Sequence, residues 1–149
     1  MKHTEQNILP YTQEQLFDFI ADVERYVEFV PWWVAAKVYH KGDVVHVEQA
    51  FNFGSWLQYR FSSQAVLERP VRVHIMSRDG PFLHLDIQWD FQPLPDSGCR
   101  IVLSTEFHLR SGMLQKLFDS LFPHATWRLL ETFETRAHQL YGTPFGDSV

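Results

Sequence analysis

The hydrophobic positions of this chain recur with two different periods, and the period changes twice along the sequence. Over residues 11–23, apolar side chains recur every three or four positions, which predicts an amphipathic helix. Thr12 is placed to cap this helix, and Gln15 follows it at the spacing of a capping box. From about residue 35 to residue 110 the period is two, which is typical of strands, and beyond Gly112 the helical period returns.

The middle region predicts an antiparallel meander of five or so strands with one apolar face and one wet face. Asp79-Gly80-Pro81 is a turn signal between two of these strands. The segments in which apolar and polar residues alternate are 45–53, 57–67, 71–78, 83–91 and 101–109.

The last part of the chain predicts one long helix that ends at Gly142, a residue suited to C-terminal capping. Pro123 lies inside this helical pattern, so we expect a kink or a break near residues 119–122. Residues 143–149 have the character of a flexible tail. The order helix, strands, long helix predicts a single α+β domain over residues 1–142, in which a curled sheet wraps the C-terminal helix.

Composition narrows the possible functions. A length of 149 residues fits one domain, and the net charge of −5 argues against DNA as a partner. The single cysteine, Cys99, rules out an intramolecular disulfide and any multi-cysteine zinc site. No apolar run approaches the roughly 18–20 residues of a membrane span, and we expect a cytoplasmic protein.

The sequence contains no strong signature of catalysis or metal binding. Its eight histidines do not form metal-ligand pairs, and His46, His74, His84 and His108 fall on the polar faces of their strands. Nucleophile-elbow and phosphate-binding glycine motifs are absent, and Cys99 has no base partner in the sequence. Composition alone does not exclude a Ser/His/Asp arrangement. Because the sequence shows none of the signatures named above, we expect a protein that is not an enzyme and needs no metal or cofactor.

Aromatic residues make up 15% of the chain, more than a thin layer of sheet on helix requires. Their positions on the apolar faces predict either a close-packed core or the walls of a lipid-sized cavity. We expect Trp89 and Phe133 to face each other across the gap between sheet and helix. The predicted ligand-binding set is Phe51, Tyr59, Phe61, Ile87, Trp89, Leu103, Phe107, Phe118, Leu130 and Phe133.

Two smaller groups of residues complete the predicted site. Gln49, Tyr59 and Thr105 are polar residues on the inner face, where each can orient a ligand carbonyl or be satisfied by a neighbour. An apolar cluster before the first strand predicts either buried edge packing or a cavity lip that touches a membrane. Its members are Phe29, Pro31, Trp32 and Trp33.

Several segments together resemble the coenzyme Q-binding START-domain family of the polyketide cyclase-like superfamily. In the first half these are PYTxEQLF at 10–17 and ADVExYxxFVPW at 21–32. In the second half they are DGPFxxL at 79–85, WxFxP at 89–93, FxLxS at 107–111 and FxxRAxxxY at 133–141. They occur in the family's order over nearly the whole chain. The sequence departs from the family pattern at Trp33 and Pro123.

The resemblance implies a helix-grip (START/Bet v 1-like) fold and a ligand such as ubiquinone or a similar isoprenoid lipid. It implies a non-enzymatic carrier that supports respiratory electron transport and makes transient contact with the inner-membrane surface. Bacterial relatives described as ribosome-association toxins imply an alternative, contact with the large ribosomal subunit, for which Arg25, Lys37 and Lys41 would supply a local basic patch. A cyclase-like enzyme is a third possibility that rests on fold analogy alone.

Overall fold

The computed structural model describes residues 2–41, 44–52, 58–95, 98–121 and 124–142. Within these ranges the chain forms one seven-stranded antiparallel sheet in the order β1-β7-β6-β5-β4-β3-β2. The strands are β1 (Lys2–Leu9), β2 (Trp33–Lys41), β3 (Val44–Asn52), β4 (Gln58–Glu68), β5 (Arg72–Ser77), β6 (Phe82–Pro93) and β7 (Cys99–Leu109). The helices are α1 (Gln13–Ala21), a 3₁₀ helix (Val23–Glu28), α2 (Gly112–Leu121) and α3 (Ala125–Tyr141).

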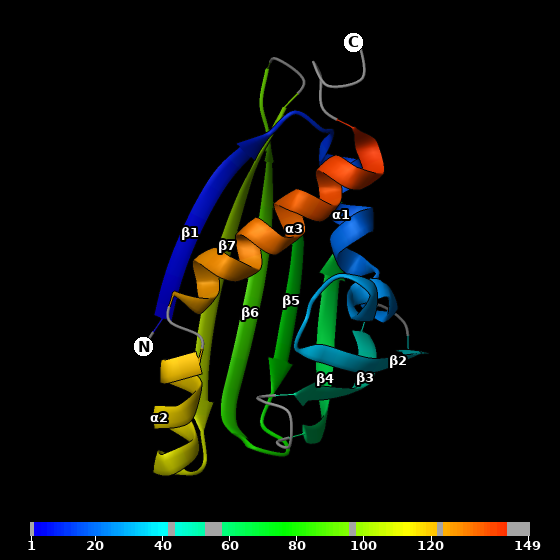
Figure 1. Ribbon diagram of the computed structural model, residues 1–149. Helices are drawn as coiled ribbons and strands as arrows, with labels where there is room; N and C mark the ends of the chain where they lie inside the picture. The colour runs from blue at the N-terminus through cyan, green and yellow to red at the C-terminus, as the bar shows by residue number, and fades with distance from the viewer. Residues whose placement is uncertain (1, 42–43, 53–57, 96–97, 122–123, 143–149) are drawn as a thin grey trace.

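The sheet curves around α3, which crosses one of its faces diagonally from the side of β1 and β7 toward α1 (Figure 1). Helix α2 lies beside β7 at the opposite end from α1. This arrangement confirms the predicted α+β, helix-grip architecture. It also fixes where a ligand site can lie, because the space between the curved sheet and the two C-terminal helices is the interior of the molecule.

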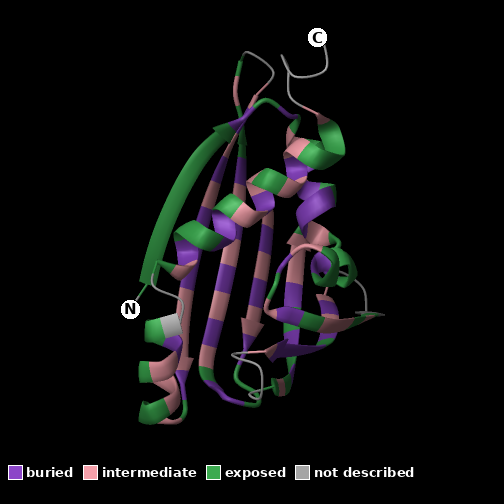
Figure 2. Ribbon diagram, in the orientation of Figure 1, coloured by how far each residue is buried: buried purple, intermediate pink, exposed green. Residues whose placement is uncertain are grey.

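Alternating burial along the strands confirms the period of two. In β6, Leu85, Ile87, Trp89 and Phe91 are buried, while the residues between them are partly exposed (Figure 2). The rings of Trp89 and Phe133 lie 4.8 Å apart between centroids, as the sequence predicts. Both side chains are at most 2% exposed, so they form the contact between sheet and helix.

The predicted cap of the first helix and the predicted break in the C-terminal helical pattern are confirmed as well. Thr12 caps α1 with its side-chain oxygen on the Gln15 amide, and the Gln15 side chain accepts from the Thr12 amide. The helical pattern beyond Gly112 is interrupted as predicted, because α2 ends at Leu121 and α3 begins at Ala125. Proline at position 123 cannot donate the hydrogen bond that would continue the helix. Residues 122–123, and the predicted tail at 143–149, lie outside the described residues.

Strand β1 was not predicted, and β2 was only partly anticipated, so the meander of about five strands is an underestimate for the described chain. The sequence of β1 is KHTEQNIL, and all of its residues except Leu9 are exposed. A strand with no buried face gives no alternation to detect. Its position is set instead by its antiparallel pairing with β7, from Lys2 opposite Glu106 to Leu9 opposite Cys99.

Among the described residues, no helix has the length and apolar character needed to cross a membrane.

The packing of Trp89 leads to a stability prediction. Because the ring is 1% exposed and contacts Phe133, Trp89→Ala should lower the free energy of unfolding by about 3–5 kcal/mol, the cost of truncating a close-packed aromatic. Urea unfolding followed by circular dichroism measures this change. Leu83→Ala is the control in the same strand, because Leu83 is 57% exposed and should change stability by less than about 0.5 kcal/mol. A small loss for Trp89→Ala would show that the ring borders free space.

A candidate ligand-binding site between the sheet and the two C-terminal helices

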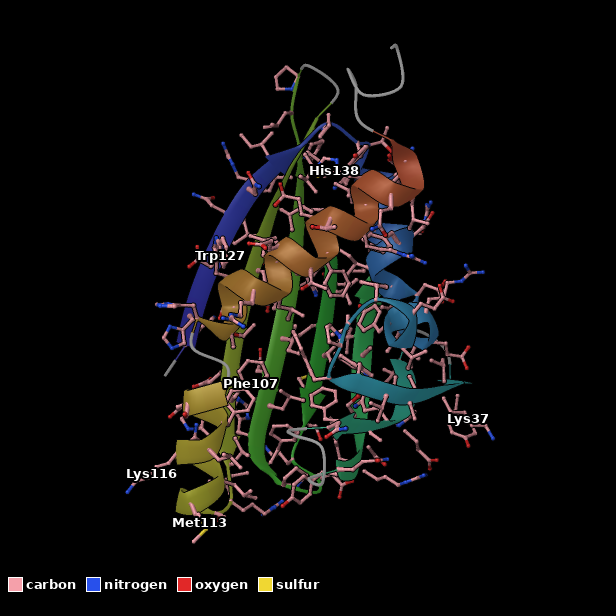
Figure 3. All side chains as sticks on the ribbon, viewed as in Figure 1. Lys37, Phe107, Met113, Lys116, Trp127 and His138 are labelled. Atoms are coloured by element: carbon pink, nitrogen blue, oxygen red, sulfur yellow. The ribbon has the colours of Figure 1, made fainter. Side chains whose placement is uncertain are left out.

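An outer pocket of about 550 Å³ lies between β1, β7, α2 and the start of α3. One side of it is apolar, formed by Phe107, Phe118, Ala125 and Trp127. Figure 3 shows Phe107 beside the junction of α2 and α3, and Trp127 on the side of α3 nearest β1. The remaining lining residues are polar: His3, Glu5, Thr105, His108, Gln115, Asp119, His124 and Thr126.

A second, inner cavity lies deeper between the sheet and the helices. It has a volume of about 20 Å³, which is room for one group the size of a water molecule. Its lining side chains include no carboxylate, imidazole, hydroxyl or thiol among the described residues. They are Trp32, Trp33, Phe51, Ile87, Phe107, Phe118, Ala125 and Leu129.

The two spaces share a wall. Phe107 of β7, Phe118 of α2 and Ala125 of α3 line both the outer pocket and the inner cavity. The rings of Phe107 and Phe118 lie 5.1 Å apart between centroids at an angle of 40°. Aromatic contacts of this kind contribute about 0.5–1.5 kcal/mol beyond their buried area. These two rings therefore separate the outer pocket from the inner cavity.

Most polar groups on the inner face are satisfied by neighbours. The hydroxyls of Thr105 on β7 and Thr126 on α3 hydrogen-bond to each other, and both residues are buried. The side-chain amide of Gln49 donates to the Ser63 hydroxyl at 2.6 Å. Tyr59 is half-buried. The sequence predicted Gln49, Tyr59 and Thr105 on this face, and it missed the threonine and serine that pair with two of them.

Two buried polar atoms of β2 and β3 have no hydrogen-bond partner among the residues that the structure describes. They are the indole nitrogen Nε1 of Trp33 and the carbonyl oxygen Oε1 of Gln49. Trp33 is 2% exposed and Gln49 is 3% exposed, so neither atom is solvated. An unsatisfied buried donor or acceptor costs about 1–3 kcal/mol. Such atoms are uncommon in native folds and require an explanation.

The ten predicted ligand-binding residues divide into two groups. Phe51, Ile87, Phe107 and Phe118 line the inner cavity. The remainder border neither this cavity nor the outer pocket and form packed or half-buried parts of the interior: Tyr59, Phe61, Trp89, Leu103, Leu130 and Phe133. Contact of any of the ten with a ligand stays a prediction.

The apolar cluster before β2 also divides. Trp33 is buried, and both Trp32 and Trp33 line the inner cavity. Phe29 is half-buried against Phe133, with ring centroids 5.1 Å apart, and Pro31 is exposed. In this arrangement Trp33 offers no surface to a membrane. Its tryptophans border the inner cavity and Phe29 packs against α3, while a role of the cluster as a cavity lip or membrane contact stays a prediction.

The histidines and the cysteine do not line the inner cavity, although His3, His108 and His124 line the outer pocket. No group of three potential metal ligands occurs among the described residues. His84 and His108 approach Glu106 on the outer face of β6 and β7, at 3.4 and 3.3 Å. Partial desolvation acts to raise the pKa of Glu106, but the His108 hydrogen bond and the nearby histidines lower it overall. Burial raises the pKa of the Cys99 thiol, which favours its unreactive protonated form.

Sequence reasoning missed the outer pocket. The residues on the β1 side of this pocket, His3 and Glu5, belong to a strand that the pattern did not predict. Trp127 is 51% exposed, and it lies outside the apolar stripe of α3. The signal that could have identified it is an exposed large aromatic residue on an otherwise polar helix face.

The comparisons with known proteins agree with this architecture. A ribosome association toxin, RatA, from Pseudomonas aeruginosa is 33% identical over 136 residues, which is 91% of this chain and 94% of the toxin. A mitochondrial coenzyme Q-binding protein COQ10 homolog B from Xenopus laevis is 28% identical over 148 residues, covering 95% of this chain and 60% of that protein. The solution structure of an 18 kDa protein from Caulobacter crescentus superposes with a TM-score of 0.73 at 30% identity, covering 96% of this chain and 99% of that one.

The family model described as polyketide cyclase / dehydrase and lipid transport matches residues 9–134, which span α1, the sheet from β2 to β7, α2 and half of α3. This description covers both catalysis and transport. Five of the six segments that resemble START domains fall inside the match and the sixth begins at its end, and the helix-grip architecture agrees with it. On this evidence the chain belongs to the polyketide cyclase / dehydrase and lipid transport family.

Proposed function

We propose that this protein binds a hydrophobic molecule of the isoprenoid quinone class, such as ubiquinone, and carries it without catalysing a reaction. The observation that supports this proposal most directly is the pairing of an aromatic inner cavity with a ligand-sized outer pocket across the Phe107–Phe118 wall. The coenzyme Q-binding relative adds support for the ligand class. In this proposal the carrier acts in the cytoplasm and exchanges its cargo at the inner-membrane surface.

The sizes of the two spaces suit an elongated apolar ligand. The outer pocket, at about 550 Å³, falls in the range of roughly 300–1,000 Å³ that is usual for small-molecule sites. Burying one five-carbon isoprene unit contributes at most about 4 kcal/mol, at roughly 0.8 kcal/mol per carbon, before ordering costs are subtracted. A quinone ring with a few isoprene units therefore reaches micromolar affinity if the Phe107 and Phe118 rings move aside.

The chemistry of the inner cavity supports binding rather than catalysis. Aromatic and aliphatic side chains line it, and the described lining includes no general acid, general base or nucleophile. A ring held there would be surrounded by apolar groups and shielded from water. This environment suits storage or transfer of a quinone and provides no group that would cyclise or hydrolyse it.

The carrier proposal predicts that the protein retains a lipid when it is purified gently. Native mass spectrometry of the purified chain should detect a bound isoprenoid quinone, and added long-tailed ubiquinone should raise the melting temperature, because ligand binding to the folded state stabilises it. A detergent-stripped sample is the control for the bound species. If no lipid is extracted with the protein and ubiquinone does not change its melting temperature, the carrier proposal is wrong.

The shared wall predicts a kinetic effect. Phe118→Ala removes one of the two rings between pocket and cavity, so ubiquinone should dissociate faster, while the fold loses about 3 kcal/mol or more of stability. Stopped-flow tryptophan fluorescence measures the dissociation rate. Met113→Ala is the matched control on α2, because Met113 is 82% exposed and lines neither space. Equal dissociation rates for wild type and Phe118→Ala would show that the ligand does not pass this wall.

A second candidate function is association with the large ribosomal subunit. It is favoured by the RatA relative, which matches this chain over nearly its whole length. The proposed contact is the basic patch near the first helix, formed by Arg25, Lys37 and Lys41. Two of these cations lie close to carboxylates. Arg25 pairs with Asp22 at 3.1 Å, and Lys37 lies opposite Glu48 in the pairing of β2 with β3. Lys41 lies at the end of β2.

This second function makes a salt-dependent prediction. The chain should co-sediment with the large ribosomal subunit at low salt and be released at moderate salt, because phosphate contacts weaken as salt rises. Lys37→Glu should reduce co-sedimentation, whereas Lys116→Glu, on α2 at the other side of the molecule, should not (Figure 3). Failure of the wild-type chain to co-sediment at low salt would rule this function out.

A further inference from the structure

One residue in the wall of the inner cavity, Trp33, carries an unpaired indole N–H, a donor that an apolar tail would not use. Trp33 forms part of the cavity wall, is 2% exposed, and has no partner for Nε1 among the described residues. An indole nitrogen donates a hydrogen bond and cannot accept one. A molecule that satisfies this atom must therefore bring an acceptor oxygen into the cavity.

The indole ring is held in place by its neighbours. Its centroid lies 4.9 Å from the Tyr26 ring at an interplanar angle of 90°, and 4.5 Å from the Phe51 ring at 66°. Trp33 opens β2, where its backbone is paired with Phe51 of β3, so the position of the main chain is also fixed. A donor held this firmly needs little reorganisation to bind a ligand.

A water molecule is a poor partner for this donor. The cavity is large enough for one, but a buried water needs two to four polar partners to be stable. The described lining side chains contain no hydrogen-bond acceptor, so a water there could donate only to a backbone carbonyl or to a group beyond the lining. A ligand oxygen has no such requirement, because a carbonyl accepts one hydrogen bond and has no proton of its own to place.

We infer that the ligand enters ring first and that one of its carbonyl oxygens accepts a hydrogen bond from Nε1 of Trp33. This inference rests on the proposed carrier function and specifies how that site selects its ligand. Once the Phe107 and Phe118 rings have moved aside and enlarged the inner cavity, the flat ring lies among Trp32, Trp33 and Phe51, and the tail extends into the outer pocket. The same cavity discriminates against a hydrocarbon of equal size, which leaves the indole unsatisfied.

The inference is tested with two probe ligands and with the NMR resonance of the Trp33 indole N–H. The probes are a ubiquinone with two isoprene units and a size-matched alkylbenzene with the same tail and no oxygen. In protein labelled with ¹⁵N at its tryptophan side chains, the quinone should shift the Trp33 indole N–H resonance downfield, and the alkylbenzene should not. The resonance is assigned by its absence in Trp33→Phe. Wild type should bind the quinone about tenfold more tightly than the alkylbenzene, the usual value of one well-placed hydrogen bond.

A variant separates the hydrogen bond from packing. Trp33→Phe keeps an aromatic ring and removes the donor, so the quinone preference should fall to about one while alkylbenzene binding persists. Trp89→Phe is the control for loss of a buried indole that borders neither space, and it should leave the preference unchanged. If Trp33→Phe does not fold, the resonance is assigned instead by nuclear Overhauser contacts of the Trp33 indole with the Tyr26 and Phe51 rings, and its shift in wild type decides the question.

The outcomes distinguish this inference from the carrier proposal. If wild type binds both probes equally, or if the Trp33 resonance does not shift with bound quinone, the ring-first hydrogen bond is wrong and the carrier proposal stands. A quinone preference that survives in Trp33→Phe overturns the inference in the same way. If neither probe binds wild type, the carrier proposal and the inference both fail.

Discussion

The packing of Phe133 holds the C-terminal helix against the sheet, and the geometry of the interior depends on it. The centroid of its ring lies within 6 Å of the centroids of four other aromatic rings. These rings belong to Phe19 on α1, Tyr26 in the 3₁₀ helix, Phe29 directly after that helix, and Trp89 on β6. One side chain therefore connects α3 to the sheet and to the N-terminal helices. These contacts fix the middle of α3, and the outer pocket and the inner cavity lie near its first turns, next to the end of α2.

The sequence pattern predicts the fold well wherever one face of an element is buried. The pattern does not predict which inward residues border the cavity. Ile87 and Trp89 show this, because both occupy inward positions of β6. Ile87 borders the inner cavity, whereas Trp89 packs against Phe133. The difference depends on where α3 lies above each residue, which is a tertiary property. Periodicity identifies which side chains point inward, and it carries no information about whether another side chain fills the space opposite them.

The two candidate functions use different parts of the molecule. The proposed quinone binding uses the interior cavity, whose walls include Trp33 and Phe118, while the proposed ribosome contact uses exposed cations such as Lys37 on the surface of β2. Lys37 there also lies over the Tyr39 ring, with its ammonium nitrogen 5.2 Å from the ring centroid. Binding at one surface therefore does not exclude binding at the other. A family whose relatives include both a coenzyme Q-binding protein and a ribosome association toxin is compatible with either use of the fold.

Strand β1 gives the outer pocket an unusual wall. It lies at the edge of the sheet and buries only Leu9, so its attachment rests on backbone pairing with β7 and on a few side-chain hydrogen bonds, such as Asn7 to Glu134 at 2.8 Å. Elements that bury little apolar surface open at low free energy without unfolding the rest of the domain. The pocket is thus bounded on one side by the packed core and on the other by a segment that can separate locally. Its width can fluctuate while the core around Phe133 stays intact.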